Sequence, residues 1–215
     1  SSMKGTEKII AHIQADAKGG IMARFFTADT HFSYVDEDVF TRDFRPFKSI
    51  KKMNNTIIKI WNKQAGKDDV IYHLGDFVNY NMRDNMFFKK CFELVKKIKA
   101  KVILIIGNNE EKIIKHEYGG NFAKLKEYLL SIGFADVIRK GITLEIGGQK
   151  VYLTHCPVDH KEGMENLFGH IHGTGFVKKY GFNVGVDNHY LRLFSEEEII
   201  DMFSRRDYFD ENVYE

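Results

Sequence analysis

The sequence predicts a mixed α/β sandwich. In the first part of the chain, short apolar strands alternate with segments of helical periodicity, and after Gly133 the pattern changes to a series of short strands. With 215 residues, 43% of them hydrophobic, the chain is long enough for one domain with a sizeable core. We interpret residues 1–21 as an N-terminal extension, in which Ser1-Ser2 resembles a cloning remnant, and residues 22–215 as a single domain.

The elements of the first half follow from their apolar pattern. Arg24–Ala28 is predicted to be a strand, and the segment from Ser49 to Gly66 a helix whose apolar stripe comprises Ile50, Met53, Ile57, Ile60 and Trp61. A strand at Val70–Leu74 and a helix near Asn85–Lys99 follow. Val102–Ile106 is apolar on both faces, which is typical of a central, fully covered strand.

The second half begins with a helix at about Asn121–Leu130 and continues with short strands that are expected to pair by hairpins. These strands are Val137-Ile138, Thr143–Ile146, Lys150–Thr154, Leu167-Phe168 and Asn183–Val186. Gly147-Gly148 predicts a hairpin turn between two of them. Ser195 with Glu198 three residues later forms a capping box, which predicts a final helix to about Phe203.

Charge and composition argue against several classes of protein. Lys and Arg exceed Asp and Glu by 32 − 30 = +2, so the chain has no global field that would recruit nucleic acid or an anionic membrane. No apolar run approaches the roughly 20 residues of a membrane span, the N-terminus lacks a signal-peptide pattern, and Cys91 and Cys156 cannot form a disulfide framework. We therefore expect a cytoplasmic protein that holds a charged substrate in a local site.

Candidate metal ligands stand where the predicted strands end. The clusters are Asp29-x-His31, Gly75-Asp76, Gly107-Asn108, His155 and Gly169-His170-x-His172. If the strands are adjacent and share a direction, these clusters converge, because α/β folds place their sites on the loops at strand ends. Asp29 and His31 are two residues apart and can chelate one ion from the same face, while the two oxygens of Asp76 could bridge two ions.

The donor set indicates the metal and the reaction. Two carboxylates, one amide and four imidazoles suit Mn²⁺, Fe²⁺ or Zn²⁺ rather than Ca²⁺. Two divalent ions, two carboxylates and a bridging hydroxide leave a net charge of about +1, which attracts a phosphoester. Two ions about 3.5–4 Å apart can hold a phosphoryl group for in-line attack by that hydroxide.

In this order, the strand-end motifs resemble those of the calcineurin-like metallophosphoesterase superfamily, from Arg24 to about Asp187. Arg45-Pro46-Phe47 and Trp61-Asn62 resemble a small bacterial and phage branch of uncharacterised phosphoesterases. The resemblance implies a four-layer α/β/β/α sandwich, with two mixed β-sheets flanked by helices. It also implies a dinuclear site at the strand-end loops, filled by Mn²⁺, Fe²⁺/Fe³⁺ or Zn²⁺.

The resemblance further implies a role for each ligand. The first metal is bound by Asp29, His31 and His172, the second by Asn108, His155 and His170, and Asp76 bridges the two. Catalytic roles are predicted for Asp76, Asn109 and Glu110, and substrate contacts for Asn109, Arg42 and Arg45. For the two arginines, a solvated loop charge is an equally good interpretation.

Asn109 departs from the family pattern, because a histidine commonly follows the Gly-Asn pair. That histidine is usually assigned to protonation of the leaving group, and an amide cannot act as a general acid at neutral pH. We therefore expect a reduced dependence on acid catalysis and a preference for leaving groups of low pKa.

Three functions remain open at this point. The leading hypothesis is metal-dependent hydrolysis of a small phosphoester, either a monoester or a diester. A nuclease or cyclic-nucleotide phosphodiesterase is the alternative within enzymes, although the near-neutral charge does not indicate a nucleic-acid partner. A metal-bound scaffold without catalysis is a third reading, motivated by Asn109. No membrane partner is expected, and the oligomeric state is left open.

Overall fold

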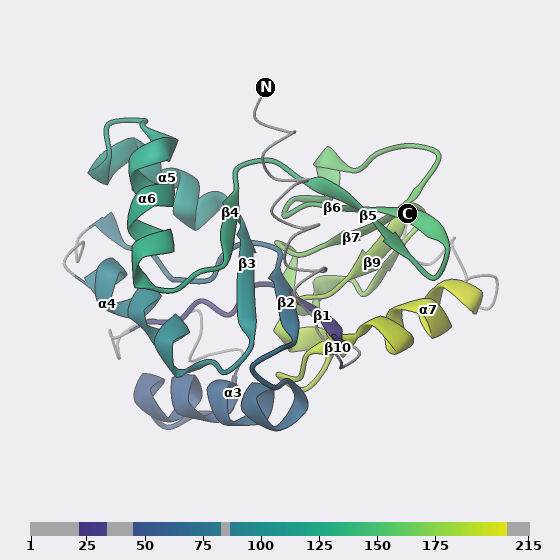
Figure 1. The fold of residues 1–215 in the computed structure, drawn as a ribbon, viewed down its shortest axis with the longest axis horizontal. Coiled ribbons are helices and arrows are strands. Elements are labelled where there is room, and N and C mark those ends of the chain that lie inside the picture. Colours follow the sequence, from purple (N-terminus) through teal and green to yellow (C-terminus); the bar gives the residue numbers. More distant parts are fainter. Residues whose placement is uncertain (1–21, 34–44, 83–86, 206–215) are drawn as a thin grey trace.

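Two five-stranded sheets face each other in the computed structural model, which describes residues 22–33, 45–82 and 87–205 (Figure 1). One apolar core fills the space between the sheets, and a second lies between the first sheet and the helices that cover its outer face. The chain thus has the predicted mixed α/β sandwich architecture. None of the described helices is long and apolar enough to cross a membrane.

The first sheet brings the ends of three parallel strands to one edge. Its order is β10-β1-β2-β3-β4, and β1 to β4 run parallel while β10 is antiparallel to β1. The strands are β1 (Arg24–Thr27), β2 (Val70–His73), β3 (Lys101–Ile105), β4 (Asp136–Ile138) and β10 (Phe194–Ser195). The loops that leave β1, β2 and β3 therefore emerge side by side.

Helices cover the outer face of this sheet (Figure 1). They are α3 (Ile50–Gln64), α4 (Phe88–Phe92) with the 3-10 helix η2 (Glu93–Lys97), α5 (Asn108–Glu117) and α6 (Phe122–Ile132). Ser49 caps α3 by accepting a hydrogen bond from the Lys52 N–H, and Trp61 on its apolar stripe is fully buried. Gly133, with φ 118°, ends α6 in the left-handed conformation that glycine adopts without strain.

The second sheet has the order β5-β6-β7-β9-β8. Its strands are β5 (Ile142–Ile146), β6 (Gln149–Leu153), β7 (Glu165–Phe168), β8 (Val177–Lys178) and β9 (Gly181–Asn183). β5 and β6 form the predicted hairpin, whose turn residues Gly147 and Gly148 have φ values of 58° and 79°. β6, β7 and β9 are parallel to one another. Short 3-10 turns follow three strands: η3 (Pro157–Asp159), η4 (His172–Thr174) and η5 (Val186–Asn188).

The final helix, α7 (Glu196–Ser204), begins at the predicted capping box. The Ser195 hydroxyl accepts from the Glu198 N–H, and the Glu198 carboxylate accepts from the Ser195 N–H. Ile199 on this helix is fully buried in the core between the sheets. The helix thereby closes one edge of the sandwich.

The sequence-based assignment of elements was wrong in several places. Helix α5 was not predicted, and neither β8 nor β10 was. The strand expected at Asn183–Val186 is β9 instead, which ends at Asn183, while Val186 begins a 3-10 turn. Within the expected helix near Asn85–Lys99, the described part changes from α to 3-10 geometry at Glu93. Finally, β6-β7 and β7-β9 are parallel crossovers, where hairpins had been expected.

Candidate metal centre

Seven polar side chains from both sheets meet at the edge where the strands end. Asp29 and His31 follow β1, Asp76 follows β2, Asn108 begins α5 after β3, His155 follows β6, and His170 and His172 follow β7. A parallel bridge between Ala28 and Gly185, with a hydrogen bond from the Val186 N–H to the Ala28 carbonyl, joins the two sheets at this edge. The structure thus brings together all seven residues that were predicted as ligands.

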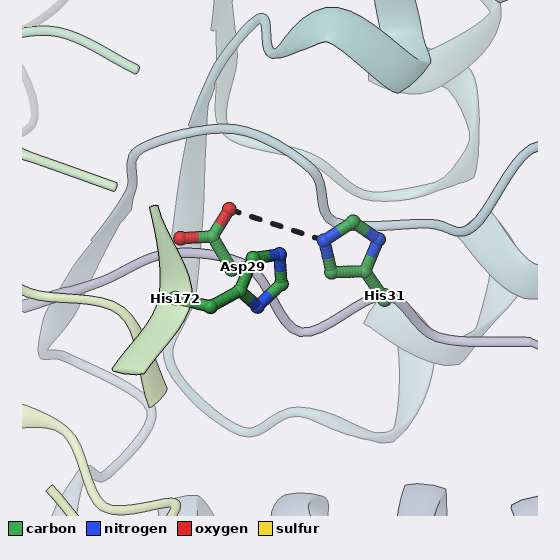
Figure 2. Close-up of side chains that lie close together, drawn as sticks. All are labelled: Asp29, His31 and His172. Atoms are coloured by element: carbon green, nitrogen blue, oxygen red, sulfur yellow. Dashed lines mark ion pairs between the residues drawn. The ribbon is translucent and has the colours of Figure 1, made fainter. Parts of the chain in front are cut away.

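Asp29, His31 and His172 form the first group of donors (Figure 2). One donor atom from each residue lies within 4.8 Å of the others. His31 Nε2 is 3.9 Å from Asp29 Oδ1, and the rings of His31 and His172 stack with their centres 4.9 Å apart. Asp29 Oδ2 accepts from the His170 N–H at 2.8 Å, whereas Oδ1 is buried without a hydrogen-bond partner among the described residues. A buried carboxylate oxygen in this state is suited to a cation.

Asn108, His155 and His170 form the second group. Asn108 Oδ1 lies 2.9 Å from His155 Nε2 and 2.8 Å from His170 Nδ1, and these two nitrogens are 3.2 Å apart. His155 Nδ1 is 2.7 Å from the Leu74 carbonyl. Because a carbonyl oxygen only accepts, we assign the imidazole hydrogen to Nδ1, which leaves the lone pair of Nε2 directed at the group.

Asp76 lies between the two groups. Its Oδ2 is 3.5 Å from His31 Nε2, and its Oδ1 is 3.6 Å from His155 Nε2. Each oxygen therefore faces a histidine of a different group. A carboxylate in this position can share its two oxygens between two cations.

The electrostatics of the two donor groups favour a bound cation. Burial and the neighbouring Asp76 carboxylate raise the pKa of Asp29 well above its ordinary value. Burial lowers the pKa of His31 to about 3 and also lowers the pKa of His155, so both imidazoles are neutral and keep a lone pair. Crowded carboxylates beside neutral imidazoles are the donor set of a borderline divalent metal.

The backbone is strained at the same positions. Outside glycine, the described chain contains seven residues with positive φ, and five of them belong to the candidate centre: Asp29 (59°), His31 (48°), Asp76 (54°), His170 (74°) and His172 (49°). This left-handed conformation is costly for a residue with a side chain and clusters at functional sites. The positive φ values of these five residues therefore support a functional role for the edge where the strands end.

Glu110 and Asn109 hold the loops that carry Asp76. The Glu110 carboxylate is fully buried and accepts from the backbone N–H groups of Asp76, Phe77, Val78 and Gly107. Burial and the nearby Asp76 raise the pKa of Glu110 to about 8, and hydrogen bonds from the N–H groups of Gly107, Asp76 and Val78 act against this rise. The Asn109 amide donates to Asp76 Oδ2 at 2.8 Å and accepts from the Tyr80 N–H at 3.1 Å. The catalytic roles given to both residues stay predictions.

Arg45 is buried, so its interpretation as a solvated loop charge is wrong. Its side chain is 4% exposed and donates to the backbone carbonyls of Asp29 and Thr30 at 2.6 Å and to Asp187 Oδ1 at 2.8 Å. The guanidinium is therefore engaged with the protein beneath the first group, and its contact with substrate stays a prediction. Arg42 lies outside the described residues.

Asp187 is a residue of the site that the sequence analysis missed. Its Oδ2 accepts from His172 Nδ1 at 3.0 Å and from Arg45 Nη2 at 3.2 Å. Burial opposes ionisation, but these hydrogen bonds from His172 and Arg45 outweigh it and lower the pKa of Asp187. Asp187 directly follows the strand predicted at Asn183–Val186, and this strand-end position, shared with the other motifs, was the signal that could have found it.

Comparison with known proteins agrees with this architecture. An uncharacterized protein of Methanocaldococcus jannaschii, MJ1445, is 31% identical over 99 residues, which are 45% of this chain. The match spans about half (53%) of that relative's length. A protein of unknown function from Aquifex aeolicus, AQ665, has a similar fold, with a TM-score of 0.59 at 19% identity over 84% of this chain and 99% of that one.

A second solved structure, described as a novel archaeal phosphodiesterase, is 24% identical over 76% of this chain and 82% of its own, with a TM-score of 0.41. The family model of the calcineurin-like phosphoesterases matches residues 22–201, which include every described strand and all seven candidate ligands. The chain therefore belongs to the calcineurin-like phosphoesterase family.

Proposed function

We propose that the chain hydrolyses phosphoester bonds with two divalent metal ions held at the strand-end edge. The observation that carries the proposal is the position of Asp76, whose two oxygens each face one histidine of a different donor group. A single ion would need only one of these groups. Two complete groups on either side of one carboxylate support a dinuclear centre.

Each group supplies a different set of donors. Asp29, His31 and His172 would hold one ion, and Asn108, His155 and His170 the other, with Asp76 shared between them. When bound, the two ions supply positive charge for the phosphoryl oxygens and a hydroxide nucleophile at neutral pH. The protein fixes the positions of the donors through Glu110, which ties the loop of Asp76 to the loop of Gly107.

Asn109 supports the centre through Asp76. Its backbone N–H and its side-chain amide donate to the two oxygens of Asp76, at 2.9 Å and 2.8 Å. These contacts fix the plane of the shared carboxylate. No general acid stands at this position, which supports the preference for leaving groups of low pKa, such as aryl alcohols.

The test compares hydrolysis of bis-p-nitrophenyl phosphate and p-nitrophenyl phosphate by metal-free protein and by protein loaded with Mn²⁺. We expect turnover only after loading. Asp76→Asn keeps the shape of the side chain but removes its charge, and we expect it to lower activity by at least about 100-fold, since even residues that only orient metal ligands cost about 10–100-fold. Glu127→Gln, an exposed charge on α6, is the matched control.

Metal content provides the second readout. Wild-type protein should retain two equivalents of Mn²⁺ after gel filtration, and Asp76→Asn fewer. Loaded wild-type protein that turns over neither ester would contradict the proposed hydrolysis and leave a metal-bound scaffold. A stoichiometry of one ion with full activity would contradict the dinuclear centre.

A further inference from the structure

A cavity of about 520 Å³ opens directly beside the second donor group. Asn108, His155 and His170 line it, whereas none of the first-group residues does. The cavity lies where the C-terminal ends of β3 and β6 meet the start of β5. Its volume falls in the roughly 300–1,000 Å³ range of small-molecule sites. A phosphoryl group at the centre would therefore have this space on one side.

Part of the cavity wall is apolar. Ile105, the last residue of β3, Ile106, which follows it, and Tyr152 on β6 line the cavity, and all three residues are buried. Thr154, also buried, adds a hydroxyl group to the same wall. Such walls favour a ring-containing organic group that makes a few hydrogen bonds.

The charges that line the cavity are balanced. Arg139 pairs with Glu111 through two contacts, Nε to Oε1 at 3.0 Å and Nη2 to Oε2 at 3.1 Å. Lys140 and Asp159 contribute one further charge of each sign. Two cations and two anions give no net attraction for a second phosphate or for the backbone of a nucleic-acid strand. Carboxylates on this lining can instead accept from hydroxyl or amino groups of an uncharged ligand.

We propose that this cavity binds the organic group of the substrate, and that the substrate is the phosphoester of an uncharged, ring-containing alcohol of about nucleoside size. The inference rests on the proposed function for the position of the phosphate. Selectivity for the organic group comes from the end of β3, from β6 and from the Glu111–Arg139 pair. A mononucleotide matches this description, whereas an oligonucleotide adds charges that the cavity does not compensate.

Cys156 offers a direct probe of occupancy. It lines the cavity and is partly exposed, whereas Cys91 is buried, and neither cysteine is in a disulfide. The chain contains only these two cysteines, so alkylation by N-ethylmaleimide can be followed at each by mass spectrometry. In protein loaded with Mn²⁺, a nucleoside 5′-monophosphate at about ten times its Kd should slow alkylation of Cys156 about tenfold by occupancy alone. Inorganic phosphate should slow it less than about twofold, and Cys91 serves as the internal control.

The outcomes of this experiment separate the inference from the proposed function. Equal protection by inorganic phosphate, or stronger protection by a single-stranded oligonucleotide than by the mononucleotide, overturns the inference. Absence of protection in protein that hydrolyses bis-p-nitrophenyl phosphate overturns the inference and leaves the function standing. Protection of Cys156 in protein that hydrolyses no ester overturns the proposed function and leaves the inference about ligand binding in the cavity standing.

A filling substitution gives an independent measurement. Cys156→Trp should raise the KM for the p-nitrophenyl ester of a nucleoside 5′-phosphate by about tenfold relative to Cys156→Ser, because a side chain then occupies the space of the ligand. The inhibition constant of inorganic phosphate, which needs only the metal centre, should differ between the two variants by less than about twofold. An equal change in both constants would show that the substitution acts through His155 and not through the cavity.

Discussion

Asp187 shows how a single residue outside the ligand set shapes the centre. It accepts from His172 Nδ1 at 3.0 Å, which leaves the other ring nitrogen of His172 to face Asp29 and His31. Arg45 in turn fixes Asp187 and donates to the backbone carbonyl of Asp29. Metal-binding histidines commonly donate their second N–H to a carboxylate, which fixes the tautomer and the direction of the ring. Asp187 is therefore a positioning residue for the first group.

We predict that Asp187→Asn weakens binding of one Mn²⁺ ion by about 10–100-fold, the usual effect of losing such a partner. The second binding event should keep its affinity, because His155 and His170 do not contact Asp187. Isothermal titration of metal-free protein resolves the two events. A general loss of folding would weaken both, and an unchanged isotherm would show that Asp187 does not orient His172.

At the residue scale, the sequence could predict which side chains converge at the candidate centre but not the contacts that orient them. Asp29 and His31 are recognisable because both lie in one short motif at a strand end. Arg45 and Asp187 are 142 residues apart, and neither type of residue is unusual in a loop. Their pairing depends on how the first sheet meets the second, which local patterns do not encode.

At the scale of elements, the periodicity of apolar residues predicted most strands and helices, but it did not indicate α5. The only buried apolar side chains of this helix are Ile113 and Ile114, which are too few to make a stripe. Its first turn is instead fixed by Glu110, whose carboxylate accepts from the Gly107 N–H. Likewise, a short apolar run indicates a strand but not its partner, so the parallel pairing of β6 with β7 could not be predicted.

The turn from β3 into α5 leads to a prediction about Gly107. A Cβ at this position would overlap the backbone nitrogen and Oδ1 of Asp76, although φ is −99° and suits any residue. Gly107→Ala should therefore destabilise the fold by about 1–3 kcal/mol, the usual cost of overpacking, and reduce hydrolysis with it. Gly66→Ala is the matched control, because its nearest neighbour would be 3.6 Å away. Urea unfolding and the hydrolysis rate with Mn²⁺ are measured for both variants. Equal stability and equal rates in Gly107→Ala and Gly66→Ala would refute this steric argument.

At the scale of the whole molecule, the candidate centre joins the two sheets. Four of its seven residues follow strands of the first sheet, and His155, His170 and His172 follow strands of the second. The sandwich class was predictable because alternation of strands and helices gives way to a run of strands along the chain. The order of the strands within each sheet could not be predicted, because it depends on crossovers between distant segments. Bound metal would add a further link between the sheets, besides the apolar core that they share.

Removal of metal should therefore lower the thermal stability of the entire domain. Each ion that binds only the folded state contributes about 2.7 kcal/mol at 100 times its Kd, so two ions contribute about 5 kcal/mol. For a chain of 215 residues this corresponds to a fall in Tm of about 10–20 °C after chelation, with recovery on adding Mn²⁺. In Asp76→Asn, chelation should change Tm much less, because the shared ligand is lost, and Glu127→Gln should respond like the wild type. Calorimetry with metal content measured on the same samples tests this prediction, and an unchanged Tm after verified loss of both ions would show that the centre does not tie the sheets together.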